Sequence, residues 1–169
     1  MKKKVLLLLF ALPIFLLIGC EMANTPTSKV ENLFTKYQKV DPDIKEGIDF
    51  ILEEQNLTDE RKNRYRKILE NQYKNLSYQI KEEEIDGDTA TVTVEIEVID
   101  LKKTINDLVY DANIYTKDTY DEEKLNRLEH AKDKVKYTLE LTLTKDDKDN
   151  EWKLNALTNE DIKKIQGMY

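Results

Sequence analysis

The sequence predicts an α+β domain in which amino-terminal helices pack on a curved antiparallel sheet of about four strands. Two observations support this fold class. Apolar residues recur at helical spacing in the first part of the chain, and from Leu76 onward the period changes to two. The alternating segments are joined by tight turns or by a detour, so we expect neighbouring strands to run antiparallel. The length predicts a single domain over residues 28–169.

Three helices are expected before the sheet. Ser28 and Glu31 have the spacing of a capping box. Asp41-Pro42 combines a cap with a proline suited to the first helical position, and Thr58 caps the third helix. The apolar faces behind these caps are Val30, Leu33, Phe34 and Tyr37; Ile44, Ile48, Ile51 and Leu52; and Tyr65, Ile68, Leu69 and Tyr73. One apolar stripe on each helix predicts packing against a core.

Two hairpins are expected to form the sheet. A tight-turn signal at Asp86-Gly87 joins the first two strands, and a charged loop at 145–150 joins the last two. The inward residues are Leu76, Tyr78 and Ile80; Ala90, Val92, Val94, Ile96 and Val98; and Val135, Tyr137, Leu139, Leu141 and Leu143, followed by a short strand over 151–154. The opposite face, with Thr91, Thr93, Glu95 and Glu97, suits water or a partner.

A helical insertion is expected between the hairpins, over about residues 101–131. Its first stripe comprises Leu101, Ile105, Leu108, Val109, Ala112 and Tyr115. Thr119 and Glu122 have capping-box spacing and lead into Leu125 and Leu128. A last short helix is expected over Asp161–Gln166.

Residues 1–19 have the composition of an export signal. Lys2, Lys3 and Lys4 precede an apolar run over 5–18 that is too short to cross a bilayer, which needs roughly 20 residues. The run ends in Leu17-Ile18-Gly19-Cys20, which resembles the lipobox of bacterial lipoproteins. The resemblance implies that signal peptidase II recognises Leu17, Ile18 and Gly19, cuts before Cys20, and leaves Cys20 carrying a diacylglycerol.

A lipidated Cys20 would hold the protein on the extracytoplasmic side of the cell membrane, with residues 20–27 as a short tether. The alternative is an ordinary secretory signal followed by an incidental cysteine. Removal of the three lysines of the signal takes the formal charge from −7 to −10. An anionic bilayer repels such a domain. We therefore expect the protein to be attached to the membrane through the lipid on Cys20. The same charge argues against nucleic-acid binding.

Residues 28–157 resemble the nuclear transport factor 2-like (cystatin-like) domains. The carriers of the resemblance are the amino-terminal helices, the run Ile85-Asp86-Gly87-Asp88-Thr89-Ala90-Thr91-Val92, and the late Glu151-Trp152-Lys153-Leu154. The resemblance implies a sheet that curls into a cone, with a pocket between the sheet and the helices.

No catalytic, metal or cofactor motif stands out. Cys20 is the only cysteine, so the chain has no internal disulfide or thiolate zinc site. His130 is the only histidine and reads as a solvated helix residue. No nucleophile elbow surrounds Ser77, so the sequence does not favour a catalytic serine triad. Three other charged groups read as solvated surface. The alternatives are calcium binding for the first group, acid–base catalysis for the second and contact with an anionic partner or headgroup for the third. The groups are Asp147, Asp149 and Glu151; Glu82, Glu83 and Glu84; and Arg61, Lys62, Arg64, Arg66 and Lys67. We expect no cofactor.

The aromatic residues offer a candidate pocket. Tyr73, Tyr78 and Tyr137 fall on apolar faces, and Trp152 could join them. Tyrosine suits a pocket wall because it both packs and hydrogen-bonds, and it suits a core equally well.

These observations favour a non-enzymatic binding module that contacts another cell-envelope protein or a small ligand, through the sheet or a pocket. The alternative is an enzyme that uses a carboxylate in the pocket of the cone. A solute-binding protein of a transporter is disfavoured, because such proteins resemble longer, two-lobed chains.

Overall fold

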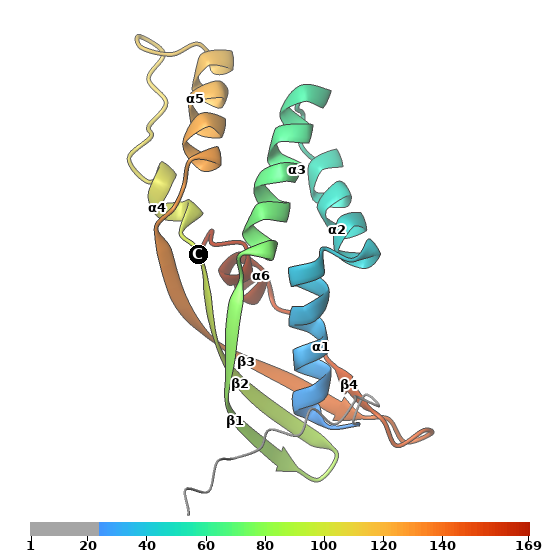
Figure 1. Cartoon of the computed structure of the whole chain (residues 1–169). Helices are drawn as coiled ribbons and strands as arrows, with labels where there is room; N and C mark the ends of the chain where they lie inside the picture. The colour runs from blue at the N-terminus through green and yellow to red at the C-terminus, as the bar shows by residue number, and fades with distance from the viewer. Residues whose placement is uncertain (1–23) are drawn as a thin grey trace, which may run out of the picture.

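The computed structural model describes residues 24–169, so the predicted signal peptide and Cys20 lie outside the described part of the chain. Four strands form one antiparallel sheet in the order β1-β2-β3-β4, and three helices precede it, which confirms the α+β class (Figure 1). The elements are α1 (Pro26–Lys39), α2 (Pro42–Glu53), α3 (Asp59–Lys74), β1 (Ser77–Asp86), β2 (Thr89–Ile99), α4 (Leu101–Ile105), α5 (Lys117–Glu129), β3 (Lys134–Lys145), β4 (Trp152–Leu154) and α6 (Asn159–Ile165).

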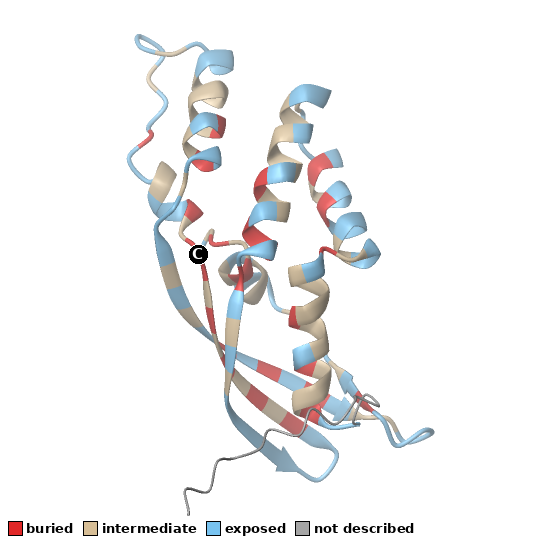
Figure 2. Cartoon of the chain, viewed as in Figure 1, coloured by how far each residue is buried: buried red, intermediate tan, exposed pale blue. Residues whose placement is uncertain are grey.

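The main core lies between α1 and one face of the sheet. Val30 and Phe34 of α1 are fully buried, and they belong to one apolar cluster with Val92, Val94 and Leu139 of the central strands. Buried and accessible residues alternate along β2 and β3, as Figure 2 shows by its banding. The period of two read from the sequence therefore corresponds to one buried and one solvent-facing side of the sheet.

The solvent-facing side of the sheet is covered by cross-strand ion pairs. Lys134 lies 3.0 Å from Glu97, and Lys136 lies 3.0 Å from Glu95, which also pairs with Lys81 at 3.5 Å. These pairs neutralise each other on the surface, so this face is suited to water.

The first helix begins earlier than the sequence predicted. Thr25 is its N-cap, with Pro26 at the first helical position, and Ser28 completes the capping box in place of Glu31. Asn24 is already part of the fold, because its side chain accepts a hydrogen bond from the Trp152 N–H at 2.9 Å and donates one to the Asn150 carbonyl at 3.0 Å. Residues 24–27 of the expected tether therefore belong to the fold.

The insertion lies between the hairpins as expected, but it is not helical throughout. The segment 106–116 is irregular, so Val109 and Ala112 do not continue the helical stripe of Leu101 and Ile105. Helix α5 is capped by Thr116, with Thr119 as the third residue of its capping box, so the predicted pairing of Thr119 with Glu122 is wrong. Thr116 is the N-cap because its hydroxyl accepts the hydrogen bond from the Thr119 N–H.

The sheet, α3, α6 and the insertion meet at one buried contact, the Gln72 junction, which comprises Gln72, Ile99, Ile165 and Gly167. The fully buried Gln72 side-chain N–H₂ donates to the Ile99 carbonyl at 3.0 Å and to the Ile165 carbonyl at 3.4 Å. Gly167 has φ +67°, and its carbonyl accepts a hydrogen bond from Lys102 N–H at 2.8 Å. The junction therefore fixes where α3 and α6 sit relative to the end of β2.

We expect Gly167→Ala to lower the free energy of unfolding by more than about 2 kcal/mol. A Cβ at this position would lie 2.0 Å from the Ile99 carbonyl oxygen and 2.6 Å from Gln72 Nε2, on a backbone with positive φ. The matched control is Gly47→Ala in α2, where a Cβ meets nothing within 4 Å. That variant should gain roughly 0.5–1 kcal/mol. Urea denaturation measures both, and equal midpoints would contradict the expected close packing at Gly167.

Candidate functional site

The four aromatic residues of the predicted pocket lie in four separate contacts. Tyr73 and Trp152 are buried in the main core, whereas Tyr78 and Tyr137 pack against it from partly exposed positions. Each ring has its own aromatic or cation–π partner, which is Tyr37 for Tyr73, Phe34 for Tyr78, Tyr169 for Tyr137, and Lys145 for Trp152. Burial raises the pKa of Tyr73, as expected for a packed ring. The structure does not bring the four residues together, and it places them in packing contacts.

His130 and Glu83, two of the other polar candidates, have structural partners. His130 is the exposed C-cap of α5, and its Nδ1 lies 2.7 Å from the Asn126 carbonyl oxygen. The Glu83 carboxylate accepts a hydrogen bond from the Thr27 N–H at 2.8 Å, and so compensates the positive end of α1. Within residues 24–169, no group of three or more acidic, histidine or cysteine side chains is arranged to hold a metal ion.

The basic residues of α3 have partners that the sequence did not reveal. Arg64 was expected to lie on a solvated surface, but its guanidinium binds α5. It donates to Glu129 at 2.7 and 2.8 Å and to the Asn126 side chain at 2.8 Å, and it also contacts Glu122. The side chains thus form a fork-shaped contact that spans two turns of α5.

Arg61 makes a second contact between the same two helices. Its guanidinium lies 3.2 Å from the Asp118 carboxylate and 3.6 Å from that of Asp121, and it also donates to the Asp118 carbonyl at 2.9 Å. We call Arg61 and Arg64, with their partners on α5, the arginine clasp. Because α5 lies in the insertion, the clasp joins the insertion to the amino-terminal helices.

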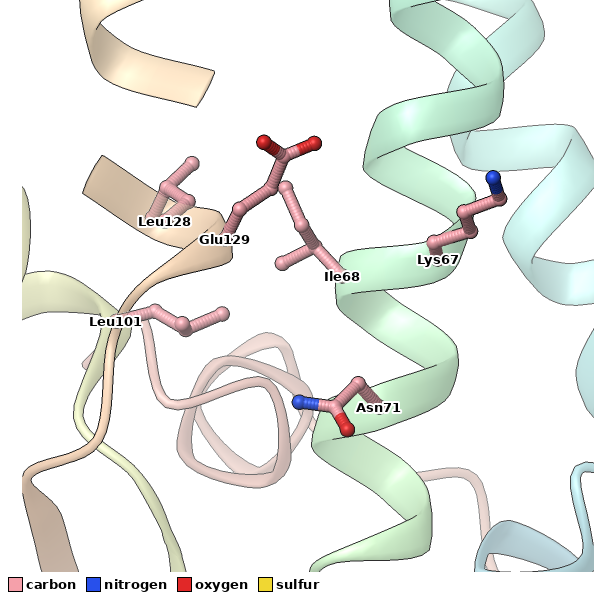
Figure 3. A pocket seen from close by; sticks show the side chains of 6 residues that line it. All are labelled: Lys67, Ile68, Asn71, Leu101, Leu128 and Glu129. Atoms are coloured by element: carbon pink, nitrogen blue, oxygen red, sulfur yellow. The ribbon is translucent and has the colours of Figure 1, made fainter. Parts of the chain in front are cut away.

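A small apolar cluster lies below the clasp. Ile68 of α3 packs there with Leu101, Leu125 and Leu128 of the insertion. Figure 3 shows Ile68 and Leu128 facing each other across the space between α3 and α5, with Leu101 at the same opening. This opening has a volume of about 130 Å³, and Lys67, Asn71 and Glu129 line its polar side.

A second cavity, of about 180 Å³, opens on the other side of the same apolar contact. It shares Ile68, Leu101 and Leu128 with the first cavity. Its further lining consists of Ile51, Leu52, Gln55, Tyr65, Leu69, Lys124, Gln166 and Met168. We call the two cavities together the α3–α5 groove. A cavity of about 150 Å³ holds a benzene ring, so the groove has room for one small apolar group.

Two ionisable groups of the groove have shifted pKa values. Hydrogen bonds from Arg64 lower the pKa of Glu129, so this carboxylate stays charged. Burial raises the pKa of Tyr65 to about 12, so its phenol stays neutral. A general acid or base would need a pKa near the working pH. Neither the Glu129 carboxylate nor the Tyr65 phenol has such a pKa.

Comparison with known proteins found no matching family model, no matching curated protein and no matching solved structure. Over residues 24–169, no helix is long and apolar enough to cross a membrane. The groove and the arginine clasp were not predicted from the sequence, because the clasp and the contact of Ile68 with Leu128 join residues more than fifty positions apart. The sole hint was an arginine-rich α3 and the acidic residues Asp118, Asp121 and Glu122 in the first half of α5.

We expect Arg64→Gln to raise the pKa of Glu129 towards its ordinary value, because its main hydrogen-bond donor is lost. In the wild type, the stabilisation from a lowered carboxylate pKa is present above the ordinary glutamate pKa and is lost as the pH falls through the pKa of folded Glu129. Carboxyl NMR titration measures the shift. The control is Lys103→Gln, which should raise the pKa of Asp133 and leave Glu129 unchanged. An unchanged Glu129 pKa in the Arg64→Gln variant would contradict the contact of Arg64 with Glu129 in the arginine clasp.

Proposed function

We propose that this protein is an extracytoplasmic lipoprotein, anchored by lipid on Cys20, which acts as a binding module and not as an enzyme. The observation that carries the proposal is the position of Asn24. This residue is hydrogen-bonded to the β3–β4 hairpin only four positions after Cys20. A lipid on Cys20 would therefore hold the hairpin end of the domain close to the bilayer.

The charge of that end supports attachment through lipid alone. The two hairpin turns next to the start of α1 carry Asp86 and Asp88 on one side and Asp146, Asp147 and Asp149 on the other. Lys153 contacts Asp146 and lies 3.4 Å from Asp149. Carboxylates in excess at this end disfavour contact with anionic headgroups, so the acyl chains would supply the attachment.

Two features support binding over catalysis. Glu129 is held charged by Arg64, and the α3–α5 groove is open and lined mainly by apolar side chains. We propose that the groove takes an apolar side chain of a protein partner.

The likeness to nuclear transport factor 2-like domains also stays a proposal, supported by three helices before the sheet and by the late strand at Trp152. In this chain, apolar side chains fill the space between α1 and the sheet.

Cys20→Ala tests the anchor. We expect the wild type to incorporate labelled palmitate and to leave the membrane only with detergent. The variant should lose the label and keep its signal peptide, because signal peptidase II requires the lipid-modified cysteine. Globomycin, which inhibits that peptidase, should cause the same larger precursor to accumulate in the wild type.

The matched control is His130→Ala, an exposed position on α5, which should be labelled and processed as the wild type is. A Cys20→Ala protein that is cut to the mature size and stays with the membrane would overturn the proposal of a lipid anchor.

A further inference from the structure

The loop between α4 and α5 exposes three large apolar side chains. Val109 and Ile114 are 73% and 71% exposed, and Tyr110 is 49% exposed. Scattered apolar residues are ordinary on a surface, whereas several gathered on one loop mark an interaction site. We call residues 106–116 the tyrosine-braced tip, for the contacts described next.

Tyr120 of α5 holds the tip in one shape. Its hydroxyl donates a hydrogen bond to the Leu108 carbonyl at 3.1 Å, and Leu108 itself is buried. The rings of Tyr110 and Tyr115 both pack edge-on against the Tyr120 ring, at centroid distances of 5.4 and 5.8 Å. Aromatic pairs of this geometry are favourable beyond their burial.

Polar contacts complete the bracing. The Asp111 carboxylate accepts a hydrogen bond from the Asn113 N–H at 2.8 Å, and the Asp111 carbonyl accepts one from the Tyr115 N–H at 2.8 Å. Arg127 of α5 lies 2.8 Å from Asp107. Exposed apolar groups on a braced loop lose little conformational freedom on binding, which favours affinity.

The tip lies at the end of the molecule farthest from the start of α1. Figure 1 shows the loop between α4 and α5 at the top, and the start of α1 with both hairpin turns at the bottom. Asn24 belongs to the bottom end, through its bonds to Asn150 and Trp152. An anchor on Cys20 would therefore direct the tip away from the bilayer.

The charge around the tip selects the chemistry of its partner. Residues 106–123 contain a single lysine, Lys117, and six acidic residues: Asp107, Asp111, Asp118, Asp121, Glu122 and Glu123. Arg61, Arg64 and Arg127 offset part of this charge. The carboxylates of Asp107 and Asp118 remain 79% and 86% exposed. An apolar knob with acidic surroundings is complementary to an apolar pocket with a basic rim.

We propose that the tyrosine-braced tip is a docking site for another cell-envelope protein, whose apolar pocket with a lysine- and arginine-rich rim receives Val109 and Ile114. The cellular location of this partner rests on the proposed function, whereas the chemistry of the contact rests on the tip alone. Insertion into an anionic bilayer is opposed by the carboxylates. Pairing with a second copy would bring two acidic tips together.

Photocrosslinking in the cells that make the full-length protein tests the proposal. A benzophenone amino acid replaces Val109 or Ile114, or, as the matched control, Phe50 of α2, which is 63% exposed. We expect one discrete protein adduct from the two tip positions and none from Phe50. Mass spectrometry should place the adduct in an apolar pocket that has lysine or arginine residues at its rim.

The identified partner is then purified and its affinity measured. Val109→Ser with Ile114→Ser should weaken binding at least tenfold, Asp107→Lys should weaken it and reduce its salt dependence, and Phe50→Ser should leave it unchanged. Adducts are scored in membrane and soluble fractions, so loss of the Cys20 anchor is not mistaken for loss of docking. Adducts with lipid or with a second copy, equal adducts from Phe50, or binding insensitive to the tip variants would each overturn the proposal.

Discussion

The side-chain amide of Gln72 is the contact on which the arrangement of this molecule depends. It joins the middle of the chain to two later segments, because its N–H₂ group bonds to the carbonyls that end β2 and α6. Its oxygen is buried without a hydrogen-bond partner in the described part of the chain. An unpaired buried acceptor costs about 1–3 kcal/mol, which offsets the free energy gained from the two hydrogen bonds. The role of the junction is therefore to position the segments that meet there.

The insertion leaves and re-enters the sheet beside this junction. The Asp100 N–H donates to the Asp133 carbonyl at 2.7 Å, and the Lys102 N–H donates to the Gly167 carbonyl at 2.8 Å. The groove, the arginine clasp and the tyrosine-braced tip all lie beyond these two bonds. The proposed binding end is therefore positioned by the junction and the clasp, while the main core between α1 and the sheet supports the opposite, Asn24 end.

Periodicity predicted the elements that depend on burial of one face. The inward positions of β2 and β3 and the apolar stripes of α1 to α3 pack as their spacing indicated. Local competition explains the errors. Residues 106–116 contain apolar residues at helical spacing, but the Asp111–Asn113 turn and the Thr116 cap offer the backbone other hydrogen bonds. At the start of α1, both Thr25 and Ser28 are residue types that cap helices. Thr25, which Pro26 follows, is the N-cap.

The candidate site could not be predicted in the same way. The Arg64 fork and the α3–α5 groove require contacts between residues more than fifty positions apart, and a single sequence carries no signal for such pairing. The tyrosines that fall on the predicted apolar faces serve packing. Tyr115 was expected on the helical stripe of the insertion, but it packs with Tyr110 against Tyr120 within an irregular loop, where periodicity does not predict contacts.

Hydrogen exchange on Gln72→Met tests the central role of the junction most directly. The methionine keeps the volume of the side chain but donates no hydrogen bond to Ile99 or Ile165. We expect amide exchange to accelerate over the insertion and α6, while the centre of β2 and β3 stays protected as in the wild type. Unchanged exchange throughout, or uniform acceleration that includes the main core, would contradict the view that this one amide positions the insertion on the sheet.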